Sequence, residues 1–389
     1  MISDEGSAVV RLARAEDVGA ILDLLTEYDR PRAYFEPYYL HDPSYLPEQS
    51  LVVERAGRLL AHLRIFDRTL RMQGTPLRIA GVGNVITSRV ARGRGYAGQL
   101  LQQVVVVARE LGYVYSLLWT HLPDLYAGYG WAPLGQAFVQ TELTAPAGTE
   151  AAEGTHTIAE FAPADLPAVM RLYDAFNANR TGTVIRSPEY WQGQLAWLQA
   201  GRPGFLVCRD TAGVLVGYVR SRVSAGVTEI LELGAPADRI AVARMLVGAA
   251  AASTEGRLRA HLPSSLYGAL APQAHEIVLE SGLMGRVLNL PALVRMLASR
   301  VSECGAAGVL QLATSAGAAT VQVDADEMTL ERATGSAQDD PLGEAALAHL
   351  LFHGFDSEAG DLLGDRTDAA LLKRLFPEQD FVLWPADDF

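Results

Sequence analysis

Three arginines lie close together in the stretch RVARGRGYAG, residues 89–98. The stretch follows the apolar run VGNVIT and precedes the helix-like run QLLQQVVVVAREL, so it predicts a turn from a strand into a helix. Such a turn presents free backbone N–H groups at the positive end of a helix dipole. Gly93 and Gly95 let the backbone approach a ligand closely, and Arg92 and Arg94 add positive charge. The pattern predicts a site for an oxygen-rich anion such as a pyrophosphate.

The spacing separates this turn from two common phosphate-binding loops. The loop of nucleotide hydrolases requires GxxxxGK followed by Ser or Thr, which the turn lacks. The dinucleotide pattern GxGxxG is met by GRGYAG at 93–98, but the expected acidic residue about 20 positions further on is missing. Structural glycines in a tight turn would explain the string equally well. A ligand therefore needs support from the rest of the chain.

The elements around the turn occur twice. Residues 9–25 align with residues 157–173, each with an extended stretch, an Asp-bearing helix entry and a helix with apolar residues at helical spacing. Residues 51–65 and 205–221 each predict two strands joined by a tight turn. A strand, a turn and a helix follow in both halves, but the second half has APAD in place of the Arg/Gly turn. We predict two copies of one α/β unit, of which the second has lost the anion site.

The repeated α/β pattern ends at about residue 300, and a different order of predicted strands and helices follows. Three runs in which apolar and polar residues alternate predict an antiparallel set of strands. The stretches 340–354 and 367–377 predict helices. The whole chain is thus expected to combine an α/β part with an α+β part. The predicted domains are 1–150, 151–297 and 298–389.

The composition narrows the classes of function. The 389 residues are 49% apolar and carry a formal net charge of -13, which argues against nucleic acid as a partner and favours small cations. The two cysteines, Cys208 and Cys304, lack metal-ligand spacing and a placed histidine, so neither a metal site nor an acyl-cysteine is expected. No apolar run reaches the roughly 20 residues of a membrane span, and no signal peptide is evident. We expect a cytoplasmic protein without a membrane partner.

The turn and the elements before it resemble the Gcn5-related N-acetyltransferases (GNAT), whose signature R/Q-x-x-G-x-G/A is met at Arg92, Gly95 and Ala97. The resemblance implies that the preceding strand pairs with the pantetheine arm of acetyl-CoA and that the turn binds its pyrophosphate. Thr87 and Arg89 stand where many members have Val and Pro. By position, the implied cofactor residues are Val85, Ile86, Thr87, Arg92, Gly93, Arg94, Gly95, Tyr96, Ala97, Gly98, His121 and Leu122.

The segment DLYAGYGW extends the resemblance. In the family, Y-x-x-x-G-F/W carries a tyrosine that protonates the departing CoA thiolate, and Tyr126, Gly130 and Trp131 match this pattern. A phenol with a pKa near 10 is a competent proton donor to a thiolate. Tyr129 competes for the role, and simple packing would also explain Tyr126.

Nearly the full chain is similar to the enhanced-intracellular-survival (Eis) family of aminoglycoside acetyltransferases. The similar features are one working GNAT copy, a degenerate second copy and a final module like sterol carrier proteins. The resemblance implies that the α-carboxylate of Phe389 is the base toward the substrate amine and that the protein forms hexamers. The amine would attack the thioester directly, backbone N–H groups near Val85 would polarise its carbonyl, and Tyr126 would protonate the sulfur. Asp387 and Asp388 are expected to be solvated, and their place next to this active end also makes them candidates for recruiting the amine.

Two other functions stay open at this point. The acceptor amine could belong to a protein lysine or a polyamine. Alternatively, the protein could be a non-catalytic regulator that binds CoA or a lipid, with an apolar guest in the carrier-like domain. Release of thiol from acetyl-CoA separates catalysis from binding alone.

Overall fold

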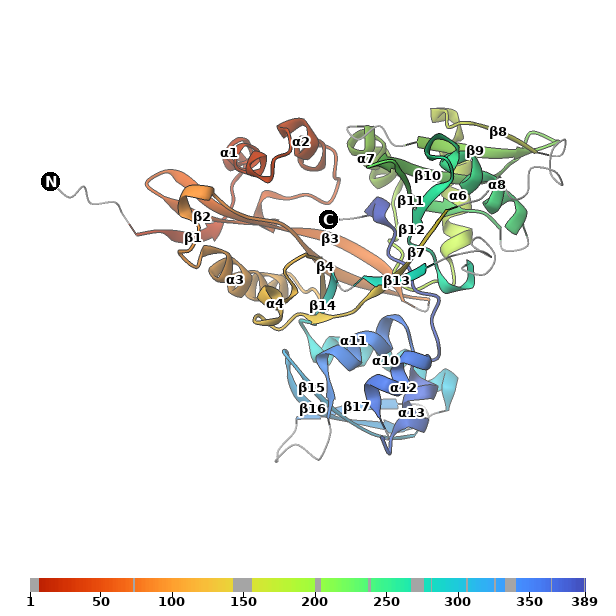
Figure 1. Ribbon diagram of the computed structural model, residues 1–389. Helices are drawn as coiled ribbons and strands as arrows, with labels where there is room; N and C mark the ends of the chain where they lie inside the picture. Colours follow the sequence, from red (N-terminus) through yellow and green to blue (C-terminus); the bar gives the residue numbers. More distant parts are fainter. Residues whose placement is uncertain are drawn as a thin grey trace.

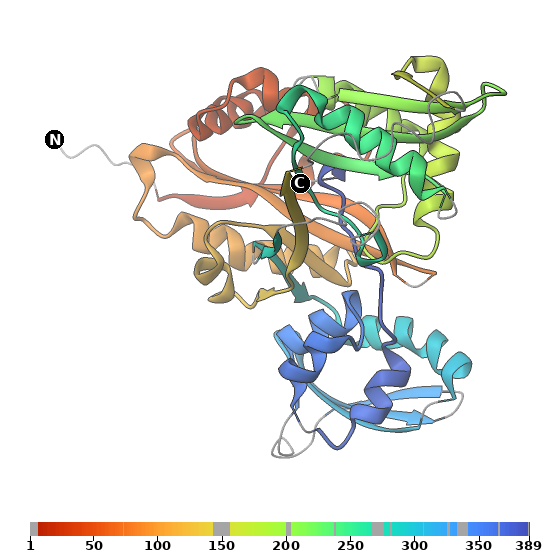
Figure 2. The same cartoon turned by 45° about the vertical axis from the view of Figure 1, so that its right-hand side comes forward.

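The molecule consists of three bodies, two α/β units and a smaller α+β body beneath them (Figures 1 and 2). The N-terminal unit and the second unit lie side by side, and the chain end returns from the third body to lie between them. This computed structural model describes residues 7–72, 74–142, 156–199, 204–236, 239–266, 276–280, 282–305, 307–324, 327–332, 341–364, 366–387 and 389.

The first unit is built on a mixed sheet. Its described strands, in spatial order, are β1 (Val9–Leu12), β2 (Ser50–Arg55), β3 (Arg58–Met72), β4 (Thr75–Thr87), β5 (Tyr115–Trp119), β14 (Leu283–Val287) and β6 (Ala132–Pro133). One face packs against α3 (Tyr96–Glu110) and α4 (Pro123–Ala127), and the other is covered by α1 (Val18–Leu25) and α2 (Arg32–Leu40). Strand alternation sends Leu63 and Ile65 to the α3 face and Arg64 and Phe66 to the α2 face.

The second unit repeats this architecture. Its described strands, in spatial order, are β8 (His156–Glu160), β9 (Gly204–Asp210), β10 (Leu215–Ser224), β11 (Val227–Gly234), β12 (Arg257–Ala260), β7 (Gln136–Glu142) and β13 (Glu276–Glu280). Its helices are α6 (Leu166–Asn177), α7 (Pro188–Gln199) and α8 (Ile240–Ala251). The predicted tandem of α/β units is confirmed. Residues 237–238 in the turn before α8 lie outside the described residues, so the loss of a second anion site stays a prediction.

The helix entries show why the two halves share a sequence pattern. In the first copy the backbone N–H of Arg14 donates to the carboxylate of Asp17 (2.7 Å), and in the second Ala162 donates to Asp165 (3.0 Å). Each aspartate therefore fixes the chain direction immediately before its helix. The same local interaction at the same position explains the aligned residues.

The two sheets exchange one strand. Strand β7 follows the first unit in the chain, yet it pairs with β12 and β13 in the second sheet. Strand β14 follows the second unit, yet it pairs with β5 and β6 in the first sheet. The exchanged strands occupy the same place in the two strand orders. Neither sheet is complete without a segment from the other half.

The third body is a four-stranded sheet covered by helices. Its described strands are β17 (Glu327–Arg332), β16 (Gly317–Asp324), β15 (Gly308–Thr314) and β18 (Leu342–Gly343). Its helices are α10 (Leu290–Cys304), α11 (Glu344–Phe352), α12 (Ser357–Leu363) and α13 (Ala369–Leu375). The predicted mixture of hairpin strands and helices is confirmed, and the predicted boundary at 297–298 falls inside α10. The body packs on the first sheet, where the rings of Tyr115 and Phe352 lie 5.5 Å apart.

Two histidines, the buried His62 and the half-buried His353, predict a loss of stability in mild acid. Burial lowers the pKa of His62 to about 3, and burial with the nearby His349 lowers the pKa of His353 to about 4. An unfolded histidine titrates near 6.5, so the unfolded state binds more protons as the pH falls below that value. We expect the free energy of unfolding to fall by about 1.4 kcal/mol per pH unit for each histidine, from below pH 6.5 down to the folded-state pKa of that histidine.

Urea unfolding between pH 7.5 and pH 4.5 measures this dependence. His353→Gln is expected to reduce the slope of the unfolding free energy against pH by the contribution of about one proton, because a glutamine in that place cannot titrate. An unchanged slope in the variant would mean that His353 is already charged in the folded protein.

Candidate active site

The Arg/Gly turn lies between β4 and α3, at the N-terminal end of the helix. Gly93 and Gly95 both have a φ of 76°, a left-handed conformation that glycine adopts without strain. Arg92 and Arg94 are exposed on either side of Gly93. Because the first N–H groups of a helix lack intrahelical partners, the turn can present both donors and positive charge to one anion.

The other predicted turn residues form the first turn of α3. The ring of Tyr96 is buried in the core beneath the helix, so its contribution to a ligand site is limited to the backbone. Ala97 and Gly98 are half-buried. A side chain at Gly98 would collide with the hydroxyl group of Tyr129. Gly98 therefore allows Tyr129 to pack against the start of the helix.

Arg89, the third arginine of the sequence cluster, is engaged elsewhere. Its guanidinium group donates to Asp29 (2.6 Å), and its backbone N–H donates to the Glu27 carboxylate (2.6 Å). Ser88 donates to the other oxygen of Glu27 (2.9 Å). These contacts tie the end of β4 to the segment after α1. Arg89 is thus a structural residue, whereas Arg92 donates a long bond to the carbonyl of Thr87 (3.4 Å).

Strand β4 bulges at Asn84 and Val85, which leaves the extra residue without a partner in the strand ladder. Asn84 has a φ of 53°, and its carbonyl oxygen lies 3.1 Å from Nδ1 of His62. The Asn84 side chain donates to the Tyr39 hydroxyl (3.2 Å), and the Tyr28 hydroxyl donates to the Val85 carbonyl (2.6 Å). The bulge is therefore held from both sides. The sequence motifs contain no signal for His62 or Tyr28.

The bulge lies where β4 and β5 diverge. Residues 79–81 of β4 pair in parallel with residues 115–117 of β5. Beyond this ladder β4 continues through Val85 to Thr87, with Ile86 buried, while β5 ends and leads to His121 and Leu122. His121 and Leu122 are exposed, and the N–H of Leu122 donates to the Thr120 hydroxyl (2.9 Å). Strands β4 and β5 therefore separate after a shared ladder. The predicted residues 85–87 lie on β4, and the predicted residues His121 and Leu122 follow β5.

Tyr126 lies on α4, next to the strand end. It is 8% exposed, and its ring meets Trp131 edge-on at 6.3 Å. Burial raises the pKa of Tyr126 above its usual 10, and a hydrogen bond with Thr120 partly offsets the rise. The phenol is therefore protonated at neutral pH, as a proton donor must be.

Phe389 lies on the face of β4 that bears Gly81 and Gly83, opposite the face that packs against α3. A methyl group on Gly83 would lie 2.6 Å from the α-carboxylate carbon of Phe389, and one on Gly81 would lie 2.8 Å from its ring. The rings of Phe389 and Phe66 are 6.1 Å apart. The two glycines of β4 thus make room for Phe389 directly before the bulge.

A cavity of about 240 Å³ lies between the end of β5 and the second sheet. Trp119 and His121 line it from the first unit, Arg222 and Glu229 line it from the second, and Pro385 lines it from the chain end. Arg222 donates to the Glu229 carboxylate through Nε (2.5 Å). The cavity combines aromatic walls with groups of both charges.

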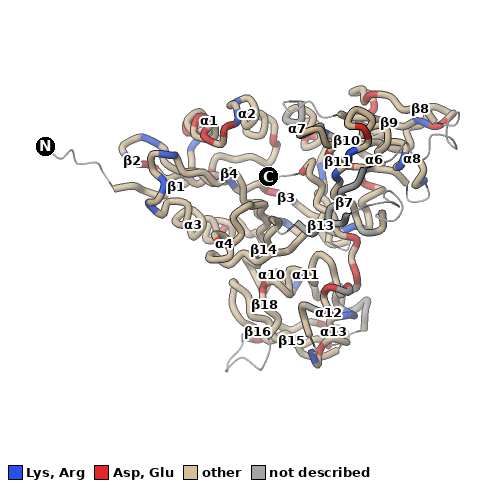
Figure 3. Tube along the Cα trace, in the orientation of Figure 1, with Lys and Arg blue, Asp and Glu red and all other residues tan. Residues whose placement is uncertain are grey.

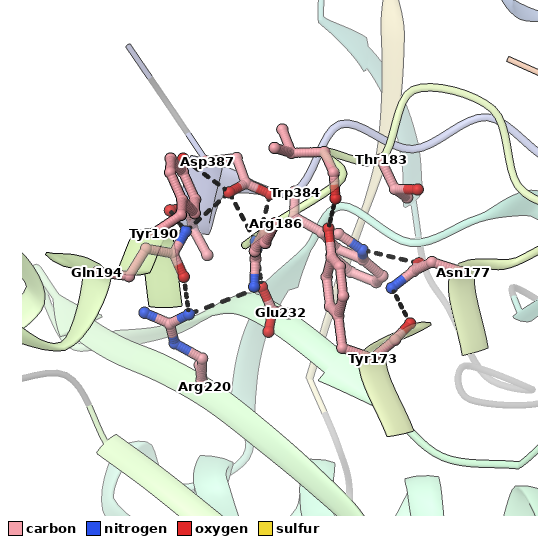
Figure 4. Close-up of polar contacts among 12 residues, drawn as sticks. Tyr173, Asn177, Thr183, Arg186, Tyr190, Gln194, Arg220, Glu232, Trp384 and Asp387 are labelled. Atoms are coloured by element: carbon pink, nitrogen blue, oxygen red, sulfur yellow. Dashed lines mark hydrogen bonds and ion pairs between the residues drawn. The ribbon is translucent and has the colours of Figure 1, made fainter. Parts of the chain in front are cut away.

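Asp387 is buried, so the expectation that it is solvated is wrong. It is 1% exposed and is held by Arg186, Tyr190 and Gln194 (Figure 4). The prediction failed because the arginine that compensates this charge lies about 200 residues earlier in the chain. Asp388 lies outside the described residues.

Within the part of the chain that the structure describes, no helix is long and apolar enough to cross a membrane. The described residues also contain no group of three His, Cys, Asp or Glu side chains that could hold a metal ion. Cys208 is a buried free thiol, and burial raises its pKa, so it is a poor nucleophile.

Comparison with known proteins decides the class of the first unit. Residues 9–134 match the family model described as an acetyltransferase (GNAT) domain. The first unit is a GNAT acetyltransferase domain. The GNAT domain makes the protein an acyltransferase and implies acetyl-CoA as the acetyl donor. The matched range contains the Arg/Gly turn, the bulge of β4 and Tyr126.

Solved structures share the fold of the whole chain, not only of the GNAT domain. A GCN5-related N-acetyltransferase from Kribbella flavida is 20% identical with a TM-score of 0.70, covering 98% of both chains. A probable N-acyltransferase from Enterococcus faecalis V583 is 18% identical with a TM-score of 0.72, covering 96% of this chain and 97% of that one. Eis1 from Mycobacterium abscessus is 16% identical with a TM-score of 0.63, covering 98% and 100%. No curated protein matches the chain.

A glycine pair tests the cofactor turn of the GNAT domain. Gly95→Val is expected to weaken acetyl-CoA binding at least about tenfold, because the side chain strains the left-handed backbone and blocks its approach to the pyrophosphate. Gly112→Val is the matched control. Gly112 has a φ of 80°, is equally open to solvent and lies at the other end of α3. Calorimetric titration with acetyl-CoA compares the two, and equal binding by both variants would contradict the predicted turn.

Proposed function

We propose that the protein transfers the acetyl group of acetyl-CoA to a primary amine of a cationic, aminoglycoside-like acceptor. In this proposal Tyr126 is the general acid and the α-carboxylate of Phe389 is the general base. The observation that supports it most is the position of Phe389, which lies on Gly81 and Gly83 directly before the β4 bulge. A carboxylate there is close to the point where β4 and β5 separate.

The proposed reaction is a direct transfer. The amine nitrogen attacks the thioester carbonyl, whose developing negative charge accepts a hydrogen bond from the backbone N–H of Val85. The Tyr28 hydroxyl already engages the carbonyl of Val85, which fixes the orientation of that peptide unit. The carbon–sulfur bond then breaks, Tyr126 gives its proton to the thiolate, and Phe389 takes the proton lost by the amine. The Arg/Gly turn holds the pyrophosphate of the donor.

The cavity beside β5 is the proposed acceptor site. Basic and acidic residues occur in all three bodies (Figure 3), so acceptor recognition depends on the groups that line the cavity itself. Trp119 and Glu229 suit a cationic amine. Arg222 and Arg259 line the same cavity, and this favours a second candidate, an amine that also carries a carboxylate, such as an amino acid or peptide.

A thiol-release assay with acetyl-CoA tests both candidates. The acceptor panel contains an aminoglycoside, spermidine, free amino acids and a lysine-containing peptide, and mass spectrometry of the products identifies the acetylated amine. Turnover with the aminoglycoside supports the first candidate, and turnover restricted to amines with a carboxylate supports the second. Saturable acetyl-CoA binding without thiol release across the panel would instead indicate a non-catalytic binding protein.

A further inference from the structure

Residues 381–387 of the terminal segment are held by the second unit. Phe381 forms a bridge with Thr181, and the N–H of Val382 donates to the Thr181 carbonyl (3.0 Å). Gln136 bonds both the N–H and the carbonyl of Leu383 (2.8 and 3.1 Å). The indole of Trp384 is fully buried and donates to Asn177 (3.1 Å; Figure 4). The segment is therefore docked before it reaches the first unit.

The last described contact with the second unit is made by Asp387. Arg186 donates to both of its carboxylate oxygens, from Nε (2.9 Å) and from Nη2 (2.7 Å). The Tyr190 hydroxyl (3.1 Å) and Nε2 of Gln194 (2.7 Å) donate to Oδ1 as well. Gln194 also donates to the carbonyl of Ala386 (2.9 Å). This one carboxylate thus receives four hydrogen bonds in a site closed to solvent.

The charges of this cluster balance only when Asp387 is present. Arg186 and Arg220 are both buried and share the carboxylate of Glu232, which ion-pairs with Arg186 and lies 3.7 Å from Arg220. Burial alone would raise the pKa of Glu232, but Arg186 and Arg220 lower it below its ordinary value. Asp387 is the second negative charge for two buried arginines. Because an unpaired buried charge is strongly unfavourable, undocking of the segment is opposed.

The cluster is also connected to the first unit. The ring of Tyr190 lies 4.8 Å beneath the guanidinium of Arg68, a β3 residue that is paired with Asp42 (2.9 Å). Two residues beyond Asp387, Phe389 lies against Gly83 of β4. Two residues span at most about 7 Å, so the position of Asp387 limits where Phe389 can lie.

We propose that Asp387 and Arg186 form a clamp in the second unit that positions Phe389 at the active site of the first. In this arrangement the second unit contributes a fixed attachment point for a group that acts in another domain. Asp387 and Arg186 are positioning residues, since they act through Phe389 and not on the substrate. The predicted effect on turnover rests on the proposed function of the Phe389 carboxylate, whereas the docking of the segment does not.

Asp387→Asn tests the clamp, because it keeps the shape of the side chain and removes its charge. The matched control is Asp165→Asn, which also removes a mostly buried, arginine-paired carboxylate from the second unit but lies at the start of α6. Carboxypeptidase A, which removes C-terminal aromatic residues, measures docking directly through the rate of Phe389 release. We expect release at least tenfold faster in Asp387→Asn than in the unchanged chain or the control. Equal release rates would overturn the clamp.

Turnover then connects the clamp to catalysis. Asp387→Asn is expected to lower kcat about tenfold with little change in acetyl-CoA affinity, and to have no further effect in a chain extended by Gly-Ser beyond Phe389. Equal losses of kcat in the two backgrounds would show that Asp387 acts through the general stability of the protein, which overturns its positioning role. Faster release of Phe389 with unchanged kcat would support the clamp and contradict the proposed base.

Discussion

Extension of the chain by Gly-Ser beyond Phe389 is expected to lower kcat for amine acetylation by about 10²-fold or more. The added residues replace the α-carboxylate with an uncharged peptide group that cannot accept the amine proton. They also need space where Phe389 lies against Gly83. Steady-state thiol release measures kcat, and the KM for acetyl-CoA is expected to change little, because the Arg/Gly turn is on the other side of the bulge.

The same Gly-Ser sequence added at the N-terminus is the control for the extension. Gly83→Ala provides a second route to the same result, since its methyl group would lie 2.6 Å from the α-carboxylate carbon of Phe389 and must displace it. An extended chain with full activity would exclude the carboxylate as the base. Loss of activity in the extended chain together with normal activity in Gly83→Ala would show that the carboxylate tolerates a shift in position.

Tyr126→Phe is expected to lower kcat by about 10²-fold with little change in acetyl-CoA affinity. The variant keeps the ring that packs on Trp131 and loses only the proton donor. Since only the protonated phenol can donate, and burial raises its pKa above 10, the acid remains available across neutral pH and is lost only as the pH rises through that higher value. The kcat of the unchanged protein should therefore fall only at pH values above 10, and this decline should be absent in the variant.

Tyr129→Phe is the matched control, because the Tyr129 hydroxyl lies against Gly98 at the start of α3. It is expected to keep kcat within about threefold of the unchanged protein, a loss far smaller than removal of a general acid causes. A large loss in Tyr129→Phe with normal turnover in Tyr126→Phe would reverse the assignment of the acid.

The conformation of the Arg/Gly turn could be predicted because its signals are local. The Arg/Gly turn requires glycines at particular backbone conformations, and Gly93 and Gly95 have them. The entries at Asp17 and Asp165 depend on contacts three residues apart, so a pattern of neighbouring residues predicts them. The tandem α/β units followed from such local patterns.

The missed features depend on contacts between distant segments. Tyr28 reaches the carbonyl of Val85 across 57 positions, and Arg186 meets Asp387 across 201 positions. Neither contact produces a periodic pattern or a short motif in the sequence, because only the folded sheets bring the partners together. An acidic residue near a chain end is usually solvated. Asp387 is buried instead, because a buried arginine from the second unit compensates its charge.

The exchange of β7 and β14 sets an order for the events of biosynthesis. A ribosome releases the chain from its N-terminus, and domains usually fold as they emerge. Here residues 9–134 emerge with the whole Arg/Gly turn and Tyr126, but their sheet lacks β14 until residue 287 has been made. Phe389 arrives later still. A product that stops early would therefore contain the donor half of the site without the group proposed to accept the amine proton.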